Sequence, residues 1–152
     1  MTGVDRPAVL RKALARKVVD RGTQDLFEAV SGADLVILAT PVNTIIRLLP
    51  TVARSCNDHA LITDVGSVKD RIMEEAKRWF PGKNFIGGHP MAGAELSGVG
   101  AAHPLLFENA VYVLTHLRGV PKAATSRFSN FLHQLGARPL LMDPIVHDKV
   151  AS

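Results

Sequence analysis

Short apolar runs alternate along this chain with longer segments in which apolar residues recur at helical spacing. Runs of strand length lie at 34–39, 60–64, 84–88, 110–114 and 138–142, and residues 2–5 form the end of another strand. Helical stripes lie at 7–14, 26–30, 45–53, 68–79 and 124–135, and a last helix begins at Val146. This alternation predicts an α/β fold with a parallel sheet, right-handed crossovers and helices on both faces.

Turn and breaker residues add local expectations. Gly22 marks a turn, and Pro50 should kink the helix that contains it or loosen one of its turns. Ser67 is an expected helix N-cap, because Asp70 three residues later completes a capping-box pattern.

Residues that could bind a ligand or take part in catalysis lie where the predicted strands end. Ligands of open α/β sheets bind at the carboxyl ends of the strands. The residues expected there are Asp5, Thr40, Pro41, the segment 64–67 and His89.

The composition fits one soluble domain, since 47% of the 152 residues are hydrophobic and 21% are charged. No apolar stretch approaches 18 residues and no signal-peptide pattern is visible, so we expect no membrane association. Cys56 alone cannot form an internal disulfide, and the cytoplasm is the expected location.

Charge and motif content exclude several classes of protein. A net charge of +4 is compatible with an anionic ligand, although an ordinary solvated surface is the better explanation of the charge alone. Nucleic-acid binding is not indicated, because no long Lys/Arg run occurs and aromatic residues make up only 5% of the chain. The six histidines are scattered without metal-ligand spacing, so no metal site is predicted, and no Gly-x-Ser-x-Gly hydrolase motif occurs.

The sequence contains no Gly-x-Gly-x-x-Gly turn. A dinucleotide-binding unit opens with a strand, that turn and a helix, and an acidic residue about 20 residues later binds the ribose. Asp5 stands where that acidic residue would be, which suggests that the chain starts just after the phosphate-binding unit. The alternative is that Asp5 simply caps the following helix.

Two segments stand out as candidate functional loops. Residues 64–69 lie at a strand-to-helix junction, where a helix N-terminus and the Ser67 hydroxyl could face a cofactor, or where a tight turn could simply begin a helix. Residues 87–93 place His89 between glycines and a proline at the end of a strand. Backbone constrained in this way is typical of a functional site, and an imidazole can accept a proton near neutral pH.

Four motifs together resemble the prephenate/arogenate (cyclohexadienyl) dehydrogenase family. They are Asp-Leu-Val-Ile-Leu-Ala-Thr-Pro at 34–41, Thr-Asp-Val-Gly-Ser-Val-Lys at 63–69, Gly-Gly-His-Pro-Met-Ala-Gly at 87–93 and Asn-Ala-Val-Tyr-Val-Leu-Thr at 109–115. The late pair His147 and Asp148 fits the same pattern, so the resemblance covers nearly the whole chain. It implies a Rossmann-like sheet and an NAD- or NADP-dependent oxidative decarboxylation of prephenate or arogenate in tyrosine biosynthesis.

The resemblance also implies roles for individual residues. His89 would take the proton of the ring 4-hydroxyl as hydride leaves, and Ser67 would lie between the nicotinamide and the substrate hydroxyl and help to orient His89. Glu95 would lie at the mouth of the substrate pocket, and His147 would either face the substrate or stand behind His89. The other implied cofactor contacts are Asp5 at the adenine ribose, which favours NAD, Arg6, which could accept the 2′-phosphate of NADP, and Thr40, Pro41 and Gly66.

The sequence departs from the family at both ends. Residues 1–152 are expected to form a partial dinucleotide-binding domain that lacks the first strand with its Gly-rich loop. The family's C-terminal helical domain, which forms the homodimer interface, is also expected to be absent. Two alternatives therefore stay open: a non-catalytic remnant that binds a ligand or partner, and another dehydrogenase acting on hydroxy acids.

Overall fold

A computed structural model describes residues 1–82, 84–93 and 98–151. The strands are β1 (Thr2–Val4), β2 (Arg21–Thr23), β3 (Leu35–Leu38), β4 (Leu61–Asp64), β5 (Asn84–Pro90), β6 (Val111–His116) and β7 (Arg138–Leu141). The helices are α1 (Pro7–Ala15), α2 (Leu26–Ser31), α3 (Val42–Ser55), α4 (Asp70–Trp79), α5 (Lys122–Gln134) and α6 (Pro144–Val150), with a 3₁₀ turn η1 (Val99–Ala101). The predicted alternation of strands and helices is therefore confirmed.

The main sheet has five strands in the order β3-β4-β5-β6-β7, and β1 pairs with β2 in a separate two-stranded parallel sheet. Strands β3, β4 and β5 run parallel, and β6 runs parallel to β7. Strand β5 pairs antiparallel with β6, so the expectation of a wholly parallel sheet is wrong at this pair. A parallel pair needs a crossover that is usually an α-helix, whereas the described residues between β5 and β6 contain only η1.

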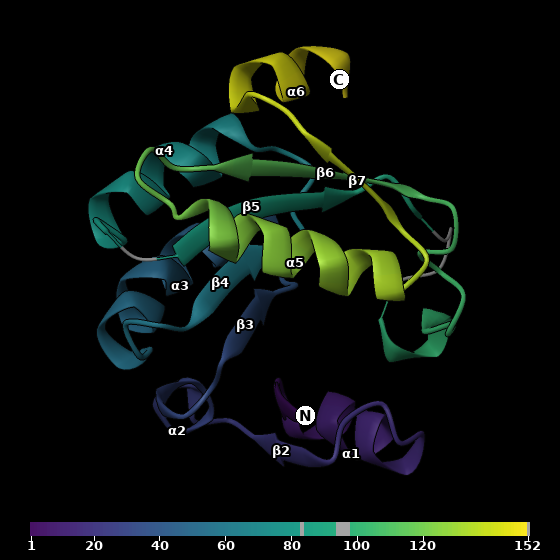
Figure 1. Ribbon diagram of the computed structural model, residues 1–152. Coiled ribbons are helices and arrows are strands. Elements are labelled where there is room, and N and C mark those ends of the chain that lie inside the picture. Colours follow the sequence, from purple (N-terminus) through teal and green to yellow (C-terminus); the bar gives the residue numbers. More distant parts are fainter. Residues whose placement is uncertain (83, 94–97, 152) are drawn as a thin grey trace.

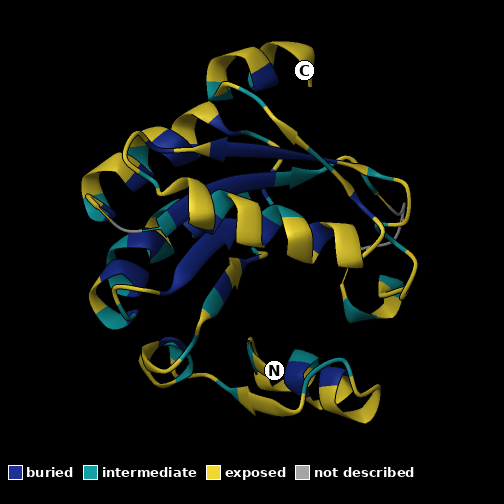
Figure 2. Ribbon diagram, in the orientation of Figure 1, coloured by how far each residue is buried: buried dark blue, intermediate teal, exposed yellow. Residues whose placement is uncertain are grey.

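Helices cover both faces of the main sheet, as the alternation predicts (Figure 1). Helices α3 and α4 pack on one face, where Ile45, Leu49 and Ile72 are completely buried. Helix α5 packs on the other face through Phe128 and Leu132. Figure 2 shows the buried residues concentrated on β4, β5 and β6 between these layers. Burial of both faces explains why the central strands read as continuous apolar runs.

One local expectation differs from the structure. Gly22 lies within β2 and pairs with Gly3, so it is not a turn residue. A Cβ on Gly22 would lie 3.2 Å from Leu10 Cδ2, which shows that the glycine permits close packing of α1 on this strand. Helix α3 contains Pro50, which has no N–H to donate to the preceding turn. None of the helices in the described part of the chain is long and apolar enough to cross a membrane.

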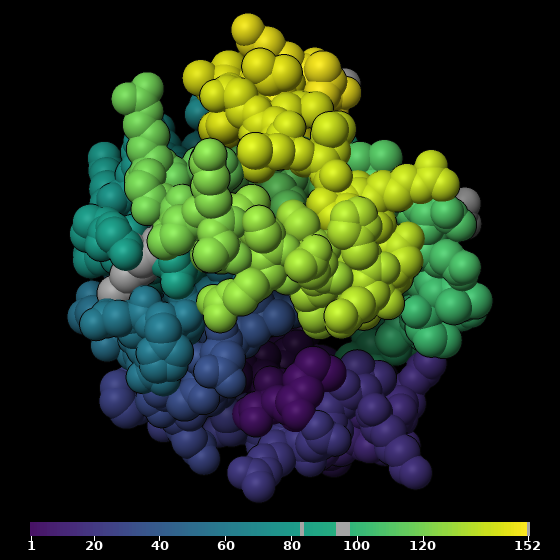
Figure 3. All heavy atoms as spheres, viewed as in Figure 1, coloured from purple at the N-terminus to yellow at the C-terminus, as the bar shows by residue number. Residues whose placement is uncertain are grey.

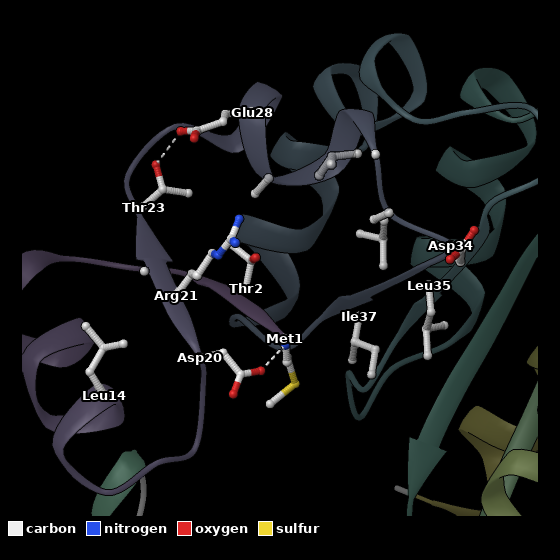
Figure 4. Close-up of a pocket in the computed structure, with 16 residues that line it drawn as sticks. Met1, Thr2, Leu14, Asp20, Arg21, Thr23, Glu28, Asp34, Leu35 and Ile37 are labelled. Carbon is white, nitrogen blue, oxygen red and sulfur yellow. Dashed lines mark hydrogen bonds and ion pairs between the residues drawn. The ribbon is translucent and has the colours of Figure 1, made fainter.

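A recess of about 1070 Å³ separates the small sheet from the main sheet. Its lining includes Met1 and Thr2 on one side and Leu35 and Ile37 of β3 on the other (Figure 4). In the space-filling view the purple N-terminal residues lie at its edge (Figure 3). Within the described residues β1 is hydrogen-bonded only to β2, and β3 only to β4. Both strands therefore present an open edge to the recess.

Candidate functional site

The carboxyl ends of β3, β4 and β5 lie at one edge of the sheet because these strands are parallel neighbours. The chain leaves this edge at Thr40, at Asp64 and at His89. Three of the segments singled out from the sequence are therefore neighbours in the fold. Asp5 follows β1 in the separate small sheet.

A buried pair, Asp64 and Lys69, holds this edge together. Both side chains are fully buried, and the Lys69 ammonium forms an ion pair with the Asp64 carboxylate. Lys69 Nζ also donates to the carbonyl oxygen of Gly88, at 2.7 Å. The carboxylate accepts two backbone hydrogen bonds, from Gly66 N at 2.8 Å and from Gly88 N at 3.2 Å. The pair thus ties the end of β4 to the following loop and to the residue before His89.

Burial dominates the electrostatics of this pair. It raises the pKa of Asp64 above its ordinary value, and Lys69 and the two backbone donors only partly oppose the shift. Burial likewise lowers the pKa of Lys69, although Asp64 opposes it. Both shifts favour the uncharged forms, since a charge removed from water is costly even beside its partner.

Close packing explains the two glycines before His89. A Cβ on Gly88 would lie 2.6 Å from the Asp64 carbonyl oxygen and 2.8 Å from Tyr112 Cε1. A Cβ on Gly87 would lie 2.5 Å from Thr115 Oγ1 and 2.6 Å from the sulfur of Met73. A side chain at Gly88 would therefore push β5 away from β4 and β6, and a side chain at Gly87 would displace Thr115 and Met73. The glycines serve packing, and they bring His89 close to the Asp64 end of β4.

Helix α4 is not capped as the sequence suggested. It begins at Asp70, its N-cap is Lys69, and no local side chain caps it. The expected Ser67 cap and its capping box with Asp70 are therefore wrong. Ser67 instead lies exposed in the loop between β4 and α4, where its hydroxyl is open to a ligand.

Asp148 supplies the cap from α6, 79 residues away along the chain. Its carboxylate accepts the backbone N–H of Lys69 at 2.7 Å and that of Asp70 at 2.9 Å. Helix α6 lies near α4 at the top of the view in Figure 1. The two donors at a helix N-terminus favour a negative charge there.

A line of hydrogen bonds runs from this carboxylate to His89. Asp148 Oδ1 lies 2.6 Å from His147 Nδ1, and His147 Nε2 lies 2.8 Å from His89 Nδ1. The two rings meet edge to face, with centroids 5.0 Å apart and an angle of 70° between their planes. His147 is completely buried, whereas His89 is partly exposed. His147 therefore stands behind His89.

The environment shifts the pKa values at both ends of this line. Burial lowers the pKa of His89, and His147 and Lys69 add to the shift more than Asp148 opposes it. Burial tends to raise the pKa of Asp148, but the hydrogen bonds from Lys69 N, Asp70 N and His147 outweigh it and leave that pKa lowered. Near neutral pH the line therefore has a carboxylate at one end and an uncharged imidazole at the other.

Comparison with known proteins identifies the fold family. The model of the prephenate dehydrogenase nucleotide-binding domain matches residues 1–141. The chain belongs to the prephenate dehydrogenase family. A prephenate dehydrogenase of Bacillus subtilis is 41% identical over 142 residues, covering 92% of this chain and 38% of that protein. A cyclohexadienyl dehydrogenase of Zymomonas mobilis is 30% identical over 139 residues, covering 91% of this chain and 47% of that protein.

Solved structures agree with this assignment. The arogenate dehydrogenase of Synechocystis superposes with a TM-score of 0.91 at 34% identity, over 98% of this chain and 53% of that one. The Aquifex aeolicus prephenate dehydrogenase in complex with hydroxyphenyl propionate and NAD⁺ gives a TM-score of 0.91 at 28% identity, over 98% and 52%. The chain spans less than half the length of the curated relatives named above.

Three residues expected to contact the cofactor, Thr40, Pro41 and Gly66, lie at or beside this edge of the sheet. Thr40 Oγ1 is buried and has no hydrogen-bond partner within the described residues. Pro41 is the N-cap of α3, and its carbonyl oxygen accepts the Thr44 N–H at 2.7 Å. The Gly66 N–H already donates to the Asp64 carboxylate. Because Gly66 has no Cβ, the loop can pack closely against the Ile72 side chain. No Gly-rich phosphate turn occurs in the sequence, so no residue here is assigned to the pyrophosphate.

The remaining expected site residues are placed as follows. Asp5 and Arg6 are exposed between β1 and α1, and the Asp5 carboxylate accepts Arg6 N at 2.7 Å. Asp5 is not the N-cap of α1, since that position is Arg6 and no side chain caps the helix. Glu95 lies outside the described residues, so its expected place at the substrate pocket is untested.

Sequence reasoning assigned no role to Lys69 or to Asp148. Lys69 closes the motif at 63–69, but a lysine in a polar loop reads as a solvated residue and not as a buried one. Asp148 follows His147 directly, and that adjacency is the one local signal of its role. Its link to α4 depends on a contact across 79 residues, which no local pattern encodes.

Removing the buried ammonium should destabilise the protein. Lys69→Met leaves Asp64 buried without its partner and should reduce the free energy of unfolding by about 3 kcal/mol. Lys77→Met on the exposed face of the same helix is the matched control and should change it by less than about 0.5 kcal/mol. Urea unfolding followed by circular dichroism measures both variants. Equal stability of the two variants would contradict the role given to the pair.

Proposed function

We propose that this chain forms the catalytic half of a nicotinamide-dependent oxidoreductase that oxidatively decarboxylates prephenate or arogenate in tyrosine biosynthesis. The observation that carries the proposal is the placement of His89. It is held at the carboxyl end of β5 by buried contacts, and its Nδ1 is bonded within the protein. Family membership and the relatives named prephenate, arogenate and cyclohexadienyl dehydrogenase support the substrate class.

His89 acts as the general base in this proposal. Its Nδ1 is bonded to His147, so Nε2 is the ring nitrogen that receives the proton of the substrate 4-hydroxyl. A bound nicotinamide supplies the hydride acceptor for the substrate C4. The ring carboxylate then leaves as carbon dioxide, and the electrons of the broken bond make the ring aromatic. The C4 oxygen recovers the proton from His89, so the histidine is regenerated.

Ser67 and the β3 edge bind the cofactor and orient the base. The exposed Ser67 hydroxyl lies in the loop that Asp64 and Lys69 hold beside Gly88, which precedes His89. Thr40 contributes its unpartnered oxygen, and Pro41 and Gly66 shape the backbone against the cofactor. Asp5 binds the adenine ribose and favours NAD, while Arg6 beside it can accept the 2′-phosphate of NADP. Glu95 contributes to the substrate pocket.

Residues 1–152 form part of a dinucleotide-binding domain, and a further parallel strand occupies the recess. The support is geometric: β1 and β3 each present an open edge to a recess of about 1070 Å³. Unpaired strand edges are costly when buried and aggregation-prone when exposed. A strand inserted there would join both sheets and bring its following loop to the cofactor edge. A helical domain beyond this one supplies the homodimer interface.

The proposed substrates and location follow from the same assignment. Prephenate and arogenate are small carboxylates, which suits a chain with a net charge of +4. The proposed location is the cytoplasm, which suits a biosynthetic dehydrogenase whose given sequence has a single cysteine.

Loss of the base should abolish turnover without removing cofactor binding. His89→Asn in the protein with its natural termini should lower kcat by at least about 100-fold, because general-base catalysis typically contributes that much. The dissociation constant for the nicotinamide cofactor should stay within a factor of about three. His133→Asn on the exposed side of α5 is the control and should leave kcat unchanged. The assay follows reduced cofactor at 340 nm with prephenate and with arogenate.

Other outcomes distinguish the alternatives. Unchanged turnover in His89→Asn would contradict the base assignment. Turnover of a simple hydroxy acid, with none of prephenate or arogenate, would identify another type of dehydrogenase. Cofactor binding without turnover of any of these substrates would favour a non-catalytic binding protein.

The proposed extra strand predicts the mass of the natural protein. Mass spectrometry of the intact protein from its source should give a value well above the 16.4 kDa of this chain. A mass of 16.4 kDa would contradict the proposed inserted strand and helical domain.

A further inference from the structure

We propose that Asp148, acting through His147, fixes the tautomer of His89 so that Nε2 is unprotonated and ready to act as the base. Asp148 and His147 are positioning residues in this scheme, which rests on the proposed dehydrogenase function.

The Asp148 carboxylate determines which nitrogen donates in each hydrogen bond of the line. Asp148 accepts the backbone N–H groups of Lys69 and Asp70, so its orientation is fixed by the first turn of α4. These donors and His147 keep its pKa low despite partial burial. An ionised carboxylate has no proton to donate, so it can only accept from His147.

His147 donates to Asp148 and accepts from His89. Its Nδ1 must carry the proton that the Asp148 carboxylate accepts at 2.6 Å. In an uncharged imidazole the other nitrogen is then an acceptor. His147 Nε2 therefore accepts from His89 Nδ1 at 2.8 Å. Complete burial of the ring prevents water from replacing either partner.

The tautomer of His89 follows from these two hydrogen bonds. Its Nδ1 carries the proton donated to His147, so the lone pair of the uncharged ring is on Nε2. The lowered pKa of His89 keeps the ring uncharged near neutral pH. The free lone pair is on the nitrogen that faces away from the protein partner, which is the nitrogen that a substrate can reach.

The same line stabilises the protonated base. When the substrate O–H bond breaks, a new N–H bond forms at His89 Nε2 and the ring becomes a cation. That cation keeps its Nδ1–H bond to His147, which is itself bonded to the Asp148 anion. Loss of carbon dioxide creates a phenolate oxygen that takes the proton back, so the ring returns to its starting tautomer.

The charges around His89 favour this arrangement over a permanently charged one. His147 and Lys69 disfavour a cation at His89, and Asp148 favours it. Asp64 is bonded to Lys69 and weakens the influence of the ammonium. The base is thus uncharged at rest, and the Asp148 carboxylate remains available to stabilise it after proton uptake.

Asp148→Ala removes the acceptor that fixes the line. In the native protein Asp148 Oδ1 accepts from both Lys69 N and His147 Nδ1, and Oδ2 accepts from Asp70 N. Without this carboxylate nothing requires His147 Nδ1 to donate, so His89 can also carry its proton on Nε2. We expect kcat to fall by at least about 10-fold, because both the fixed tautomer and the anion that stabilises the protonated base are lost, with KM nearly unchanged.

Asp143→Ala is the matched control, because the Asp143 side chain caps the same helix through Ile145 N and Val146 N and bonds to neither His147 nor Asp148. It should leave kcat and the His89 tautomer unchanged. Two-bond ¹H–¹⁵N correlation spectra of the imidazoles report the tautomers directly. The wild type should show a protonated Nδ1 at His89, and Asp148→Ala a population protonated on Nε2. Thermal unfolding of both variants checks that they are folded.

The outcomes separate this inference from the proposed function. A wild-type His89 protonated on Nε2, or an unchanged tautomer in Asp148→Ala, would overturn the inference even if the protein is an active dehydrogenase. The expected tautomers without turnover of prephenate or arogenate would uphold the arrangement of the line and overturn the proposed function. A drop in kcat for Asp143→Ala equal to that of Asp148→Ala would overturn the inference by showing a general effect of α6.

Discussion

The buried contact between Asp64 and Lys69 is the constraint on which the site depends. It joins the end of β4, the loop at Gly66 and the carbonyl of Gly88, so three backbone segments share one pair of side chains. Burial makes the pair costly to form, and the hydrogen bonds to backbone offset that cost. A fixed Gly88 in turn fixes His89, because the two residues are adjacent in β5 and both pair with β6. The chemistry thus rests on a rigid element and not on a loose loop.

Lys69 couples this pair to the second network. Its side chain binds Asp64, while its backbone N–H binds Asp148, which also holds His147. His89 is therefore positioned from two directions, through Gly88 along the strand and through His147 across it. This dual support explains how a partly exposed histidine can have a defined orientation and tautomer, which a general base requires.

The sequence predicted the parts of this arrangement that depend on local pattern. Apolar periodicity located the helices and every strand given above except β2, and the glycines beside His89 indicated a constrained backbone at the end of β5. The antiparallel β5–β6 pair was not predicted, because strand direction depends on the connection and not on periodicity. The Ser67 cap was wrong because Asp148, distant in sequence, satisfies the same donors. Lys69 was overlooked since its burial depends on a tertiary partner.

Amide hydrogen exchange at Gly66 and Gly88 tests the central constraint most directly. Both N–H groups donate to the Asp64 carboxylate, and neither would be protected if the pair opened locally. The Gly66 and Gly88 amides should exchange only through global unfolding, with the same opening free energy as amides in the centre of β4. Exchange of either amide at the rate of an exposed loop, while β4 stays protected, would contradict the claim that the buried pair holds the site together.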